Sequence, residues 1–331
     1  MKIAINGMGR IGRAALKLIL ETKGLEIIAV NDIISIDNLA YLLKYDSVYG
    51  IYDKKVSHTG QTLMVGGVQI GYTTIKNPEE LPWEEKGIDL VIESTGLFTL
   101  REDAEKHIHA GAKTVVISAP TKSKDTPTVV HGVNSLDGEI SIFSCASCTT
   151  NNISPVVEIL DRRIGIKKAI MTTVHAYTAS QELVDGASQK NFRMGRAAAT
   201  NLVPTTTGAA IATTKALPGL SGKFDGVAIR TPVPVGSISD LTFVTKKEVT
   251  PEMVNEIFTE EAASARYNQV LAVTSDPIVS SDIIKSPYAS TVDLSMTRVV
   301  DGDLLKVMTW YDNEWGFTNQ MIREIVALKT S

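Results

Sequence analysis

The sequence predicts an α/β protein in which a doubly wound, mostly parallel sheet precedes an α+β domain with a mostly antiparallel sheet. In the first half, an apolar strand pattern leads through three spaced glycines into a helical pattern. In the second half, alternating strand-like runs and the hairpin signal Asp301-Gly302 replace that arrangement. A chain of 331 residues has room for about two domains. We therefore expect one domain for each pattern.

The composition excludes several classes of protein. Hydrophobic residues make up 44% of the chain and charged residues 21%, which is typical of a globular protein. The net charge of −4 argues against a general nucleic-acid binder, and two cysteines form no disulfide framework. The amino terminus lacks signal-peptide architecture, and no apolar run approaches the roughly 18 residues that span a bilayer. We expect a soluble, cytoplasmic enzyme without nucleic-acid or membrane partners.

The glycine pattern follows the first expected strand directly. Residues 2–6 form an apolar run, and Gly7-Met8-Gly9-Arg10-Ile11-Gly12 then opens a helix. A second strand, residues 26–30, leads to Asp32, twenty positions beyond Gly12. Glycines let the backbone approach a pyrophosphate at a helix start, and the carboxylate can bind a ribose 2′-hydroxyl. This predicts a dinucleotide site of the Rossmann type. The alternative is a glycine turn that only packs the helix on the strand.

Further strands complete the first expected sheet. Residues 89–93 predict a parallel strand that ends in the small-residue loop Ser94-Thr95-Gly96, and such loops border the ligand crevice of a doubly wound sheet. Strands are also expected over residues 113–120, with Ser118 at the end, and over 128–134 and 139–143. Thr99 with Glu102 resembles a capping box and predicts a helix through Ala110.

Four histidines are expected outside the chemistry. His107 and His109 lie two apart on that helix, so they point different ways and are expected on the surface rather than on a metal. His131 lies in an apolar run and is expected to be a buried structural imidazole, while His58 lies in a polar turn. We expect no metal site, because two cysteines and one histidine distant in sequence do not complete a tetrahedral set.

Both cysteines lie in the stretch 144–152, Ser-Cys-Ala-Ser-Cys-Thr-Thr-Asn-Asn. A strand pattern, residues 140–143, precedes this stretch, and a helical pattern, residues 153–160, follows it. Free backbone N–H groups and the dipole at a helix start favour negative charge, so a cysteine in the first turn is expected to ionise. The thiolate is the nucleophilic form of cysteine. The position alone does not choose between Cys145 and Cys148.

The second half contains candidate partners for the thiol. A β-rich run, residues 168–178, carries His175 near its end, and residues 181–200 then lack a clean period, as functional segments often do. Residues 204–208 lead into a helix at 209–216, where hydroxyls and N–H groups suit a phosphate or simply cap the helix. Arg230 ends the alternating run 224–230, and a second such run covers 237–245. Helices are expected at 250–265, with Pro251 in its first position, and at 319–328, packing back on the first domain.

A dinucleotide, an activated cysteine and a histidine base together suggest one chemistry. A thiolate adds to an aldehyde, a hydride leaves to nicotinamide, and a thioester results. The histidine keeps the thiol ionised and handles the proton of the hemithioacetal oxygen. An acceptor then releases the acyl group. These features do not fix the substrate.

Six motifs occur in an order and spacing that resemble a known family. They are Asn6-Gly7-Met8-Gly9-Arg10-Ile11-Gly12-Arg13, Glu93-Ser94-Thr95-Gly96, Ser147-Cys148-Thr149-Thr150-Asn151, His175-Ala176-Tyr177-Thr178, Thr206-Thr207-Gly208-Ala209-Ala210 and Trp310-Tyr311-Asp312-Asn313-Glu314-Trp315-Gly316. Over essentially its full length the chain resembles phosphorylating glyceraldehyde-3-phosphate dehydrogenase. The resemblance implies a reversible oxidative phosphorylation of glyceraldehyde 3-phosphate to 1,3-bisphosphoglycerate, in glycolysis and gluconeogenesis.

The resemblance also implies roles for individual residues. Cys148 would be the nucleophile and His175 the base. The two anion sites would be formed by Ser147, Thr149, Thr207 and Gly208, and by Thr178 and Arg230. The cofactor positions would be Asn6, Gly7, Gly9, Arg10, Ile11, Asp32, Lys76, Thr95, Gly96, Ser118, Ala187, Ser188 and Asn313. Residues 1–148 would bind the cofactor, and residues 149–313 would form the catalytic domain. The helix within 314–331 would return to the first domain. Residues from 177 to about 200 resemble the family's S-shaped loop, which implies a homotetramer.

Three departures from the family pattern stand out. Cys145 and Asn152 replace an asparagine and a second cysteine, and Met194 stands where some members carry an anion-binding arginine. Ala187-Ser188 replaces the leucine-proline of strictly NAD-dependent members and resembles the small pair of NADP-accepting members. Asp32 opposes a 2′-phosphate, whereas Ala187-Ser188 would make room for it. We expect NAD to be used, with NADP accepted to some degree.

Other functions fit parts of the pattern. Erythrose-4-phosphate and semialdehyde dehydrogenases share the cofactor, cysteine and histidine. Cys145-Ala146-Ser147-Cys148 is formally a CxxC, so a redox sensor is an alternative from another class, with Cys145 as a resolving thiol that traps an oxidised nucleophile. An RNA-binding role lacks the expected basic and aromatic surface signature.

Overall fold

The computed structural model describes residues 1–136, 138, 140–188 and 191–328. The described chain divides into two compact units. The first unit takes in residues 1–129, the described part of 135–146, and 321–328. The second unit takes in residues 130–134 and the described part of 147–320. None of the helices in these ranges combines the length and apolar character needed to cross a bilayer.

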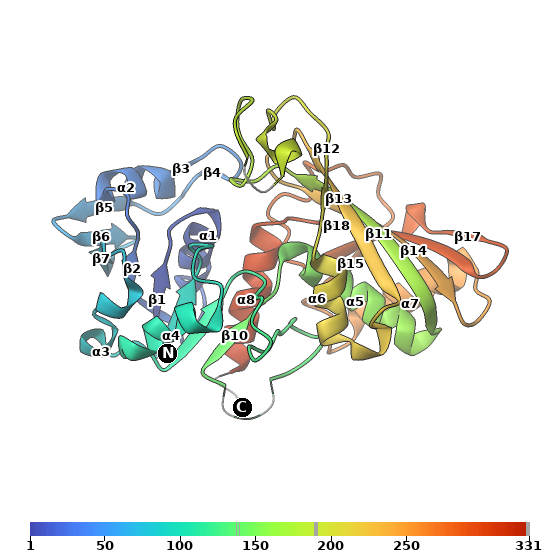
Figure 1. Cartoon of the computed structure of the whole chain (residues 1–331), viewed down its shortest axis with the longest axis horizontal. Helices are drawn as coiled ribbons and strands as arrows, with labels where there is room; N and C mark the ends of the chain where they lie inside the picture. Colours follow the sequence, from blue (N-terminus) through green and yellow to red (C-terminus); the bar gives the residue numbers. More distant parts are fainter. Residues whose placement is uncertain (137, 139, 189–190, 329–331) are drawn as a thin grey trace. The chain divides into compact units, whose positions relative to one another are not determined.

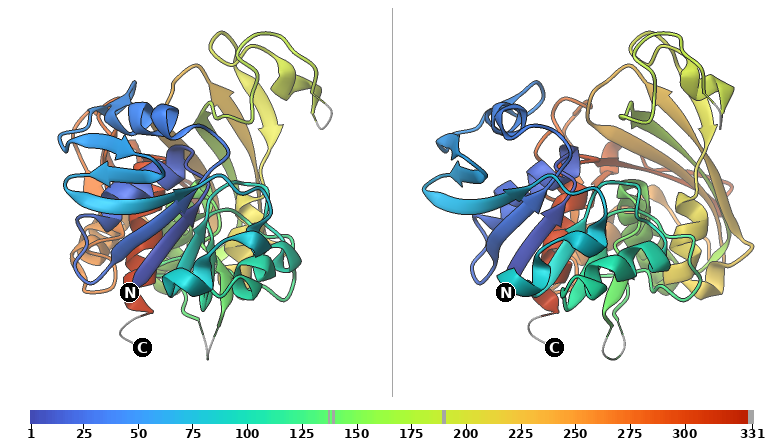
Figure 2. Two further views of the ribbon diagram at one scale, coloured as in Figure 1. Left: turned by 90° about the vertical axis from the view of Figure 1, so that its left-hand side faces the viewer. Right: turned by 60° about the vertical axis from the view of Figure 1, so that its left-hand side comes forward.

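The first unit is built on a sheet in the order β10-β9-β8-β1-β2-β7-β6-β5. Its parallel strands are β1 (Lys2–Asn6), β2 (Glu26–Asn31), β7 (Val68–Thr73), β8 (Leu90–Glu93), β9 (Thr114–Ile117) and β10 (Ile142–Ser144). An antiparallel edge adds β5 (Val56–Thr59) and β6 (Thr62–Val65), while β3 (Tyr45–Asp46) and β4 (Gly50–Ile51) pair separately. The helices are α1 (Arg10–Ile19), α2 (Ile36–Lys44), α3 (Trp83–Lys86) and α4 (Arg101–His109), with a 3-10 turn η1 (Pro78–Glu80). Figure 2 shows the blue parallel strands side by side at the centre of this unit.

The strand order explains where a ligand can bind in this unit. The chain starts at β1, runs outward through β2 and β7, and later returns to the other side of β1 as β8 and β9. The strand order therefore reverses between β1 and β8. In open parallel sheets, ligands bind at the carboxyl ends of the strands at this switch point. The doubly wound fold predicted from the glycine pattern is confirmed.

The second unit is built on a sheet in the order β12-β13-β11-β14-β18-β16-β15. The strands are β11 (Ile166–Ala176), β12 (Val203–Thr206), β13 (Phe224–Thr231), β14 (Ser237–Thr245), β15 (Leu271–Thr274), β16 (Ser290–Asp293), β17 (Arg298–Val300) and β18 (Leu304–Tyr311). The pairs β11–β13 and β15–β16 are parallel, and the other pairs in this sheet are antiparallel. The mostly antiparallel sheet predicted for the second half is therefore confirmed.

Helices cover one face of this second sheet. Figure 1 shows α5 (Cys148–Arg163), α6 (Ala209–Ala216) and α7 (Pro251–Ala263) together on that face. Their apolar side chains, including Ile153, Val157 and Phe258, form one buried cluster with strand residues such as Leu241 and Val307. Short 3-10 turns, η2 (Phe192–Gly195), η3 (Pro218–Leu220) and η4 (Leu294–Met296), interrupt the loops, and α8 (Trp315–Ala327) ends the described chain. The packed face fixes α5, and so fixes the first turn that carries Cys148.

Local signals in the second half are confirmed at several boundaries. Asp301 and Gly302 have positive φ values of 51° and 73°, and with Asp303 they form the three-residue hairpin loop between β17 and β18. Thr250 caps α7 by accepting a hydrogen bond from Met253 N, with Pro251 in the first helical position.

Three expectations about local structure are wrong. Residues 128–134 form no strand: Thr128 makes a single bridge to Ser144, and a turn follows. The Thr99 capping box does not form, because α4 begins at Arg101, whose N–H donates to Ser123 Oγ from a distant loop. The last helix begins at Trp315 rather than 319, because the Asp312 carboxylate accepts hydrogen bonds from the N–H groups of Glu314 and Trp315.

Candidate active site

Cys148 is the first residue of α5, where a sharp turn in the chain meets a helix start. Ala146 has a positive φ of 59°, which is uncommon for a residue other than glycine, and Ser147 then caps the helix by accepting from Thr150 N at 3.0 Å. The N–H of Cys148 and the N–H and hydroxyl of Thr149 lie near the sulfur and act to lower the pKa of the thiol. The helix start therefore surrounds the thiol with donors, as its position in the sequence predicts.

His175 lies next to that thiol. It is 3% exposed near the end of β11, and its Nε2 lies 3.4 Å from Cys148 Sγ. On the other side of the ring, Nδ1 lies 2.6 Å from Ala176 O and 2.5 Å from Arg230 Nη1. At most one proton can lie on Nδ1, so this atom either donates to Ala176 O or accepts from Arg230. Donation to Ala176 O leaves the Nε2 lone pair facing the thiol, which is the form that a general base needs.

Burial disfavours the charged forms of both side chains. Burial raises the pKa of the Cys148 thiol above its ordinary value, although the Arg230 charge and the Thr149 hydrogen bonds oppose this. Burial, together with the Arg230 charge, lowers the pKa of His175 to about 3. Burial thus opposes the ionisation expected of a cysteine at a helix start, and the donors there offset part of this effect. The 3.4 Å contact gives the thiol proton a direct path to His175 Nε2.

The residues predicted to bind anions lie in the second unit. Several of their side chains already make hydrogen bonds within the protein. Ser147 caps α5, and Thr149 Oγ1 lies 3.0 Å from Tyr311 Oη. Thr207 Oγ1 accepts from Ala209 N at 3.2 Å and so serves the start of α6, with Gly208 between them. Thr178 contacts Ser180 at 2.9 Å. Beside His175, the Arg230 side chain has a buried Nε with no hydrogen-bond partner among the described residues. Anion binding by these residues stays a prediction.

Asn313 and the S-loop also lie in the second unit. Asn313 is buried, and its Oδ1 accepts from Gly236 N at 3.1 Å and from Ser237 Oγ at 3.2 Å. Figure 1 shows the described residues of the S-loop, 177–188 and 191–200, beside β12. Its described residues include Ala187 and Ser188, and Gly186 N donates to Gly195 O to tie the loop together. Residues 189–190 of the predicted loop lie outside the described residues.

The three glycines of the turn in the first unit have different surroundings. A Cβ on Gly12 would lie 2.0 Å from Gly7 O, and a Cβ on Gly7, whose φ is +93°, would lie 2.6 Å from Thr95 N. Packing by itself is therefore a sufficient reason for glycine at these two positions. Gly9 differs, because a Cβ there would meet nothing within 4 Å. The open space at Gly9 favours approach of a ligand over the alternative of a turn that only packs.

The other predicted cofactor residues collect at the carboxyl ends of neighbouring strands. Asp32 follows β2, Thr95 and Gly96 follow β8, and Ser118 follows β9. The Asp32 carboxylate accepts from Met8 N at 2.6 Å and from Ile34 N at 3.2 Å, which holds it against the glycine turn. Arg10 pairs with Asp46 at 2.5 Å, Ile11 is half-buried and Lys76 is exposed. The strand ends and the glycine turn fit the pyrophosphate and ribose of a dinucleotide.

A buried polar cluster beneath this turn was missed from the sequence. Glu93 accepts from Asn6 Nδ2 at 2.7 Å and from Thr95 N at 2.8 Å, and it lies 3.1 Å from His107 Nε2. Trp83 Nε1 donates to His107 Nδ1 at 3.0 Å, so the imidazole is neutral and its Nε2–H faces the Glu93 carboxylate. The surface position expected for His107 is wrong, whereas His109 is 62% exposed. His107 belongs to the buried side of α4, where the histidine pairs with a tryptophan from α3.

The remaining histidines and Cys145 have no such role. His131 is half-buried in a turn, so the fully buried position expected for it is wrong, and His58 lies 3.1 Å from Asp37. Cys145 is 3% exposed, and burial, with Glu324 adding, raises the pKa of its thiol well above the ordinary value. A buried protonated thiol reacts slowly, which disfavours the redox-sensor alternative.

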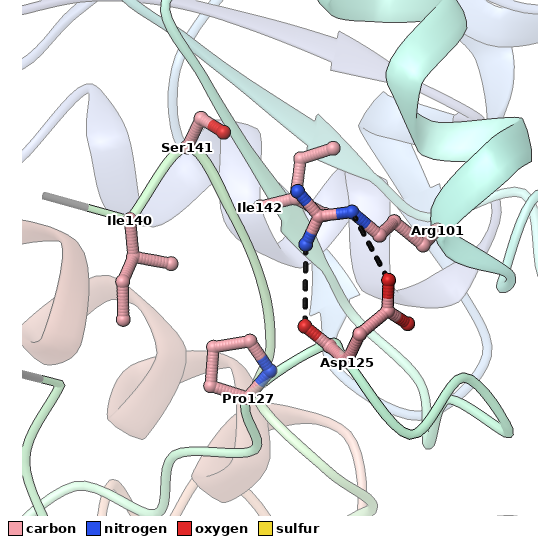
Figure 3. Close-up of a pocket in the computed structure, with 6 residues that line it drawn as sticks. All are labelled: Arg101, Asp125, Pro127, Ile140, Ser141 and Ile142. Carbon is pink, nitrogen blue, oxygen red and sulfur yellow. Dashed lines mark hydrogen bonds and ion pairs between the residues drawn. The ribbon is translucent and has the colours of Figure 1, made fainter.

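A small cavity of about 280 Å³ in the first unit contains none of these residues. Arg101, Asp125, Pro127 and residues 140–142 line it (Figure 3). Arg101 is already paired there, because Nη1 donates to Asp125 O at 3.2 Å and Nε lies 3.4 Å from Asp125 Oδ2. We assign this cavity no ligand.

The doubly wound unit with its glycine turn, and the cysteine–histidine pair of the other unit, are the parts of a nicotinamide-dependent dehydrogenase that works through a thiol. Two family models match the chain: "Glyceraldehyde 3-phosphate dehydrogenase, NAD binding domain" over residues 1–101 and "Glyceraldehyde 3-phosphate dehydrogenase, C-terminal domain" over residues 147–313. The chain therefore belongs to the glyceraldehyde-3-phosphate dehydrogenase family.

Curated relatives agree with this assignment over nearly the whole chain. The glyceraldehyde-3-phosphate dehydrogenase of Streptomyces coelicolor is 47% identical over 326 residues, covering 97% of this chain and 96% of that protein. The proteins of the same name from Clostridium pasteurianum and Geobacillus stearothermophilus are each 46% identical. They cover 98% and 97% of this chain, and 97% and 96% of their own lengths. The resemblance drawn from the six motifs is confirmed.

Proposed function

We propose that this protein oxidises glyceraldehyde 3-phosphate with NAD and inorganic phosphate to 1,3-bisphosphoglycerate, in a reversible reaction. The name shared by its relatives gives the substrate, and the NAD-binding family model supports the cofactor. The single observation that carries the chemistry is the 3.4 Å contact between Cys148 Sγ and His175 Nε2 at the start of α5. In this proposal, residues 1–148 bind the cofactor and residues 149–313 form the catalytic domain.

The buried pair sets the order of proton movements. The Sγ proton passes to His175 Nε2, and the thiolate adds to the aldehyde carbon. The carbonyl oxygen takes the proton from Nε2 to give a hemithioacetal. Bound NAD supplies the acceptor for the hydride that leaves this carbon, and His175 removes the oxygen-bound proton as the thioester forms. A phosphate oxygen then attacks the thioester and releases the acyl phosphate, and Cys148 leaves as a thiolate.

Two groups of residues are proposed to bind the two anions. Ser147, Thr149, Thr207 and Gly208 would bind the attacking phosphate, since they lie at the starts of two helices, where the helix dipole favours negative charge. Thr178 and Arg230 would bind the substrate phosphate. In that role, the guanidinium would leave His175 Nδ1, and Nδ1–H would then donate to Ala176 O alone.

NADP is proposed as a second, weaker cofactor. The Asp32 carboxylate is held by Met8 N and would repel a 2′-phosphate, whereas Ala187 and Ser188 are small. Steady-state rates with both cofactors test this. If kcat/KM with NAD exceeds kcat/KM with NADP by more than roughly a thousandfold, about 4 kcal/mol, then NADP is not accepted as a cofactor.

A homotetramer is proposed from the S-loop. Leu183, Val184 and Phe192 of this loop are 78%, 72% and 87% exposed in the single chain, and large apolar side chains so exposed favour burial against another subunit. Sedimentation of the purified protein would give the mass of the assembly, and a stable monomer would exclude the tetramer.

The test of the main proposal is NAD-linked oxidation of glyceraldehyde 3-phosphate with phosphate varied. We expect turnover to require both phosphate and the phosphorylated aldehyde. Erythrose 4-phosphate and a semialdehyde serve as competing substrates. A higher kcat/KM with either one would transfer the assignment to a sibling dehydrogenase.

A further inference from the structure

A row of polar side chains crosses the carboxyl edge of the sheet in the first unit. The row consists of the last residues of β8, β1, β2 and β7, which are, in that order, Glu93, Asn6, Asn31 and Thr73. The strand registers pair Asn6 with both Glu93 and Asn31, and they pair Asn31 with Thr73. Side chains at paired positions of parallel strands lie on the same face of the sheet. The row therefore passes the switch point between β1 and β8.

Each side chain in this row hydrogen-bonds to the next. Asn6 Nδ2 donates to Glu93 Oε2 at 2.7 Å, and Asn31 Nδ2 donates to Asn6 Oδ1 at 2.8 Å. Thr73 Oγ1 donates to Asn31 Oδ1 at 2.9 Å. Glu93, Asn6 and Asn31 are at most 4% exposed. We call these four residues the strand-end ladder. Buried polar networks are rigid where their members are satisfied.

The Glu93 end sets the direction of the ladder. Trp83 Nε1 can only donate, so His107 Nδ1 accepts from it and His107 Nε2 carries a hydrogen. That hydrogen faces Glu93 Oε2, with the two heavy atoms 3.1 Å apart, and Thr95 N donates to Glu93 Oε1 at 2.8 Å. Both carboxylate oxygens therefore accept. Asn6 must then present its amide nitrogen to Glu93 and its amide oxygen to the next strand.

The Asn31 end agrees with this direction and holds a second loop. Asn31 Oδ1 accepts from Ile75 N and Asn31 Nδ2 donates to Ile75 O, both at 2.9 Å. Lys76, a predicted cofactor residue, follows in this loop after β7. In the loop after β8, the N–H and the hydroxyl of Thr95 both donate to Glu93. The ladder thus holds two loops, and each carries a predicted cofactor residue.

We propose that the strand-end ladder holds the loops after β7 and β8 in the arrangement that binds NAD, with Asn31 and Glu93 as positioning residues for the two halves of the cofactor. A doubly wound sheet binds one mononucleotide half on each side of its switch point. The Asp32 carboxylate suits a ribose, so the loop after β7 lies on the adenosine side and the loop after β8 on the nicotinamide side. The proposal rests on the dinucleotide site of the proposed function.

Calorimetric titration of the full-length protein with NAD and with AMP, which lacks the nicotinamide half, tests the ladder. Asn31→Ala removes both hydrogen bonds to Ile75 and should weaken AMP and NAD binding by about tenfold each. Glu93→Gln turns an amide N–H toward a fixed donor, whichever way round the amide lies. It should weaken NAD binding by about tenfold and AMP binding by about threefold, because Glu93 reaches Asn31 only through Asn6. The double variant should lose less NAD affinity than the product of the single losses, since both changes break one chain.

Trp83→Phe is the matched control, since it removes a buried hydrogen bond to His107 and leaves the hydrogen bonds of the ladder in place. It should lower the unfolding free energy and leave both affinities within about twofold. If Asn31→Ala does not fold, Thr73→Val is a milder break at a half-buried position and should weaken AMP binding by about threefold.

Three results would each overturn the proposal: unchanged affinities in the folded ladder variants, an equal loss of affinity in Trp83→Phe, or losses that simply multiply in the double variant. A parent protein that binds NAD but does not oxidise glyceraldehyde 3-phosphate would contradict the proposed function alone.

Discussion

The glycine turn of the first unit and the thiol site of the second are assembled from the chain in different ways. The turn is built from consecutive residues, and the cluster beneath it, Asn6, Glu93 and His107, matches buried donors to acceptors. The thiol site takes Cys148, His175, Arg230 and Tyr311 from four separate elements. There, burial opposes the charges that the chemistry needs.

The first unit therefore mainly controls cofactor binding, whereas the thiol site mainly controls proton transfer. At the turn, backbone geometry controls what can approach, because two glycines are fixed by close contacts and the third faces open space. At the thiol site, the balance between burial and neighbouring charge controls where one proton lies. Substitutions in the two regions should therefore change different measurements.

The largest effect is expected at the nucleophile. Cys148→Ala should lower the kcat for aldehyde oxidation by at least about 10⁴-fold, because no other group can form the thioester. Its NAD affinity, measured by calorimetry, should change by less than about twofold. Retained turnover would show that the chemistry does not pass through Cys148.

A pair of glycine substitutions tests the turn. Gly12→Ala should destabilise the protein by about 3 kcal/mol or more, because the new Cβ would lie 2.0 Å from Gly7 O. Gly9→Ala should leave the unfolding free energy nearly unchanged and still weaken NAD binding, since its methyl group would occupy open space at the turn. Urea unfolding and NAD titration measure the two quantities. Unaltered NAD affinity in Gly9→Ala would mean that the cofactor does not approach there.

Two histidines on one helix form the next pair. His107→Ala should cost about 2–4 kcal/mol in unfolding free energy, because it leaves Trp83 Nε1 buried without an acceptor, removes one hydrogen bond to the Glu93 carboxylate and opens a cavity. His109→Ala, at an exposed position of the same helix, should cost less than about 0.5 kcal/mol. Equal losses in the two variants would contradict the role given to the buried cluster.

The smallest effect concerns the pH dependence of stability. His175 titrates at about 3 when folded and near 6.5 when unfolded, so the unfolded chain binds the extra proton between these values. Its contribution to stability is full above pH 6.5 and is lost as the pH falls, by about 1.5 kcal/mol between pH 6.5 and pH 5. His175→Gln should remove this part of the slope in urea unfolding. A slope that His175→Gln leaves intact would mean that the imidazole is not held neutral.

Much of the fold could be predicted because its signals are local. The strand, glycine turn and helix at residues 2–19, the Asp301-Gly302 hairpin and the Thr250 cap each depend on neighbours in the sequence. The helix start predicted at Thr99 is wrong because Arg101 N, at the start of α4, donates to Ser123 Oγ. Ser123 is distant in the sequence, so no local pattern predicts this contact. The surface position predicted for His107 is wrong because Trp83, from another helix, packs against it and donates to its Nδ1. The sequence of α4 alone does not show this contact.

By itself, the sequence determined the two kinds of sheet, the glycine turn and the cysteine at a helix start, since all three follow from hydrophobic period and local backbone chemistry. Only the tertiary structure decided that burial opposes charge on the thiol and the imidazole, that His107 is buried and that Tyr311 contacts Thr149. Desolvation and hydrogen bonding depend on which distant segments surround a group, and the sheet of the second unit brings β11, β13 and β18 together around Cys148.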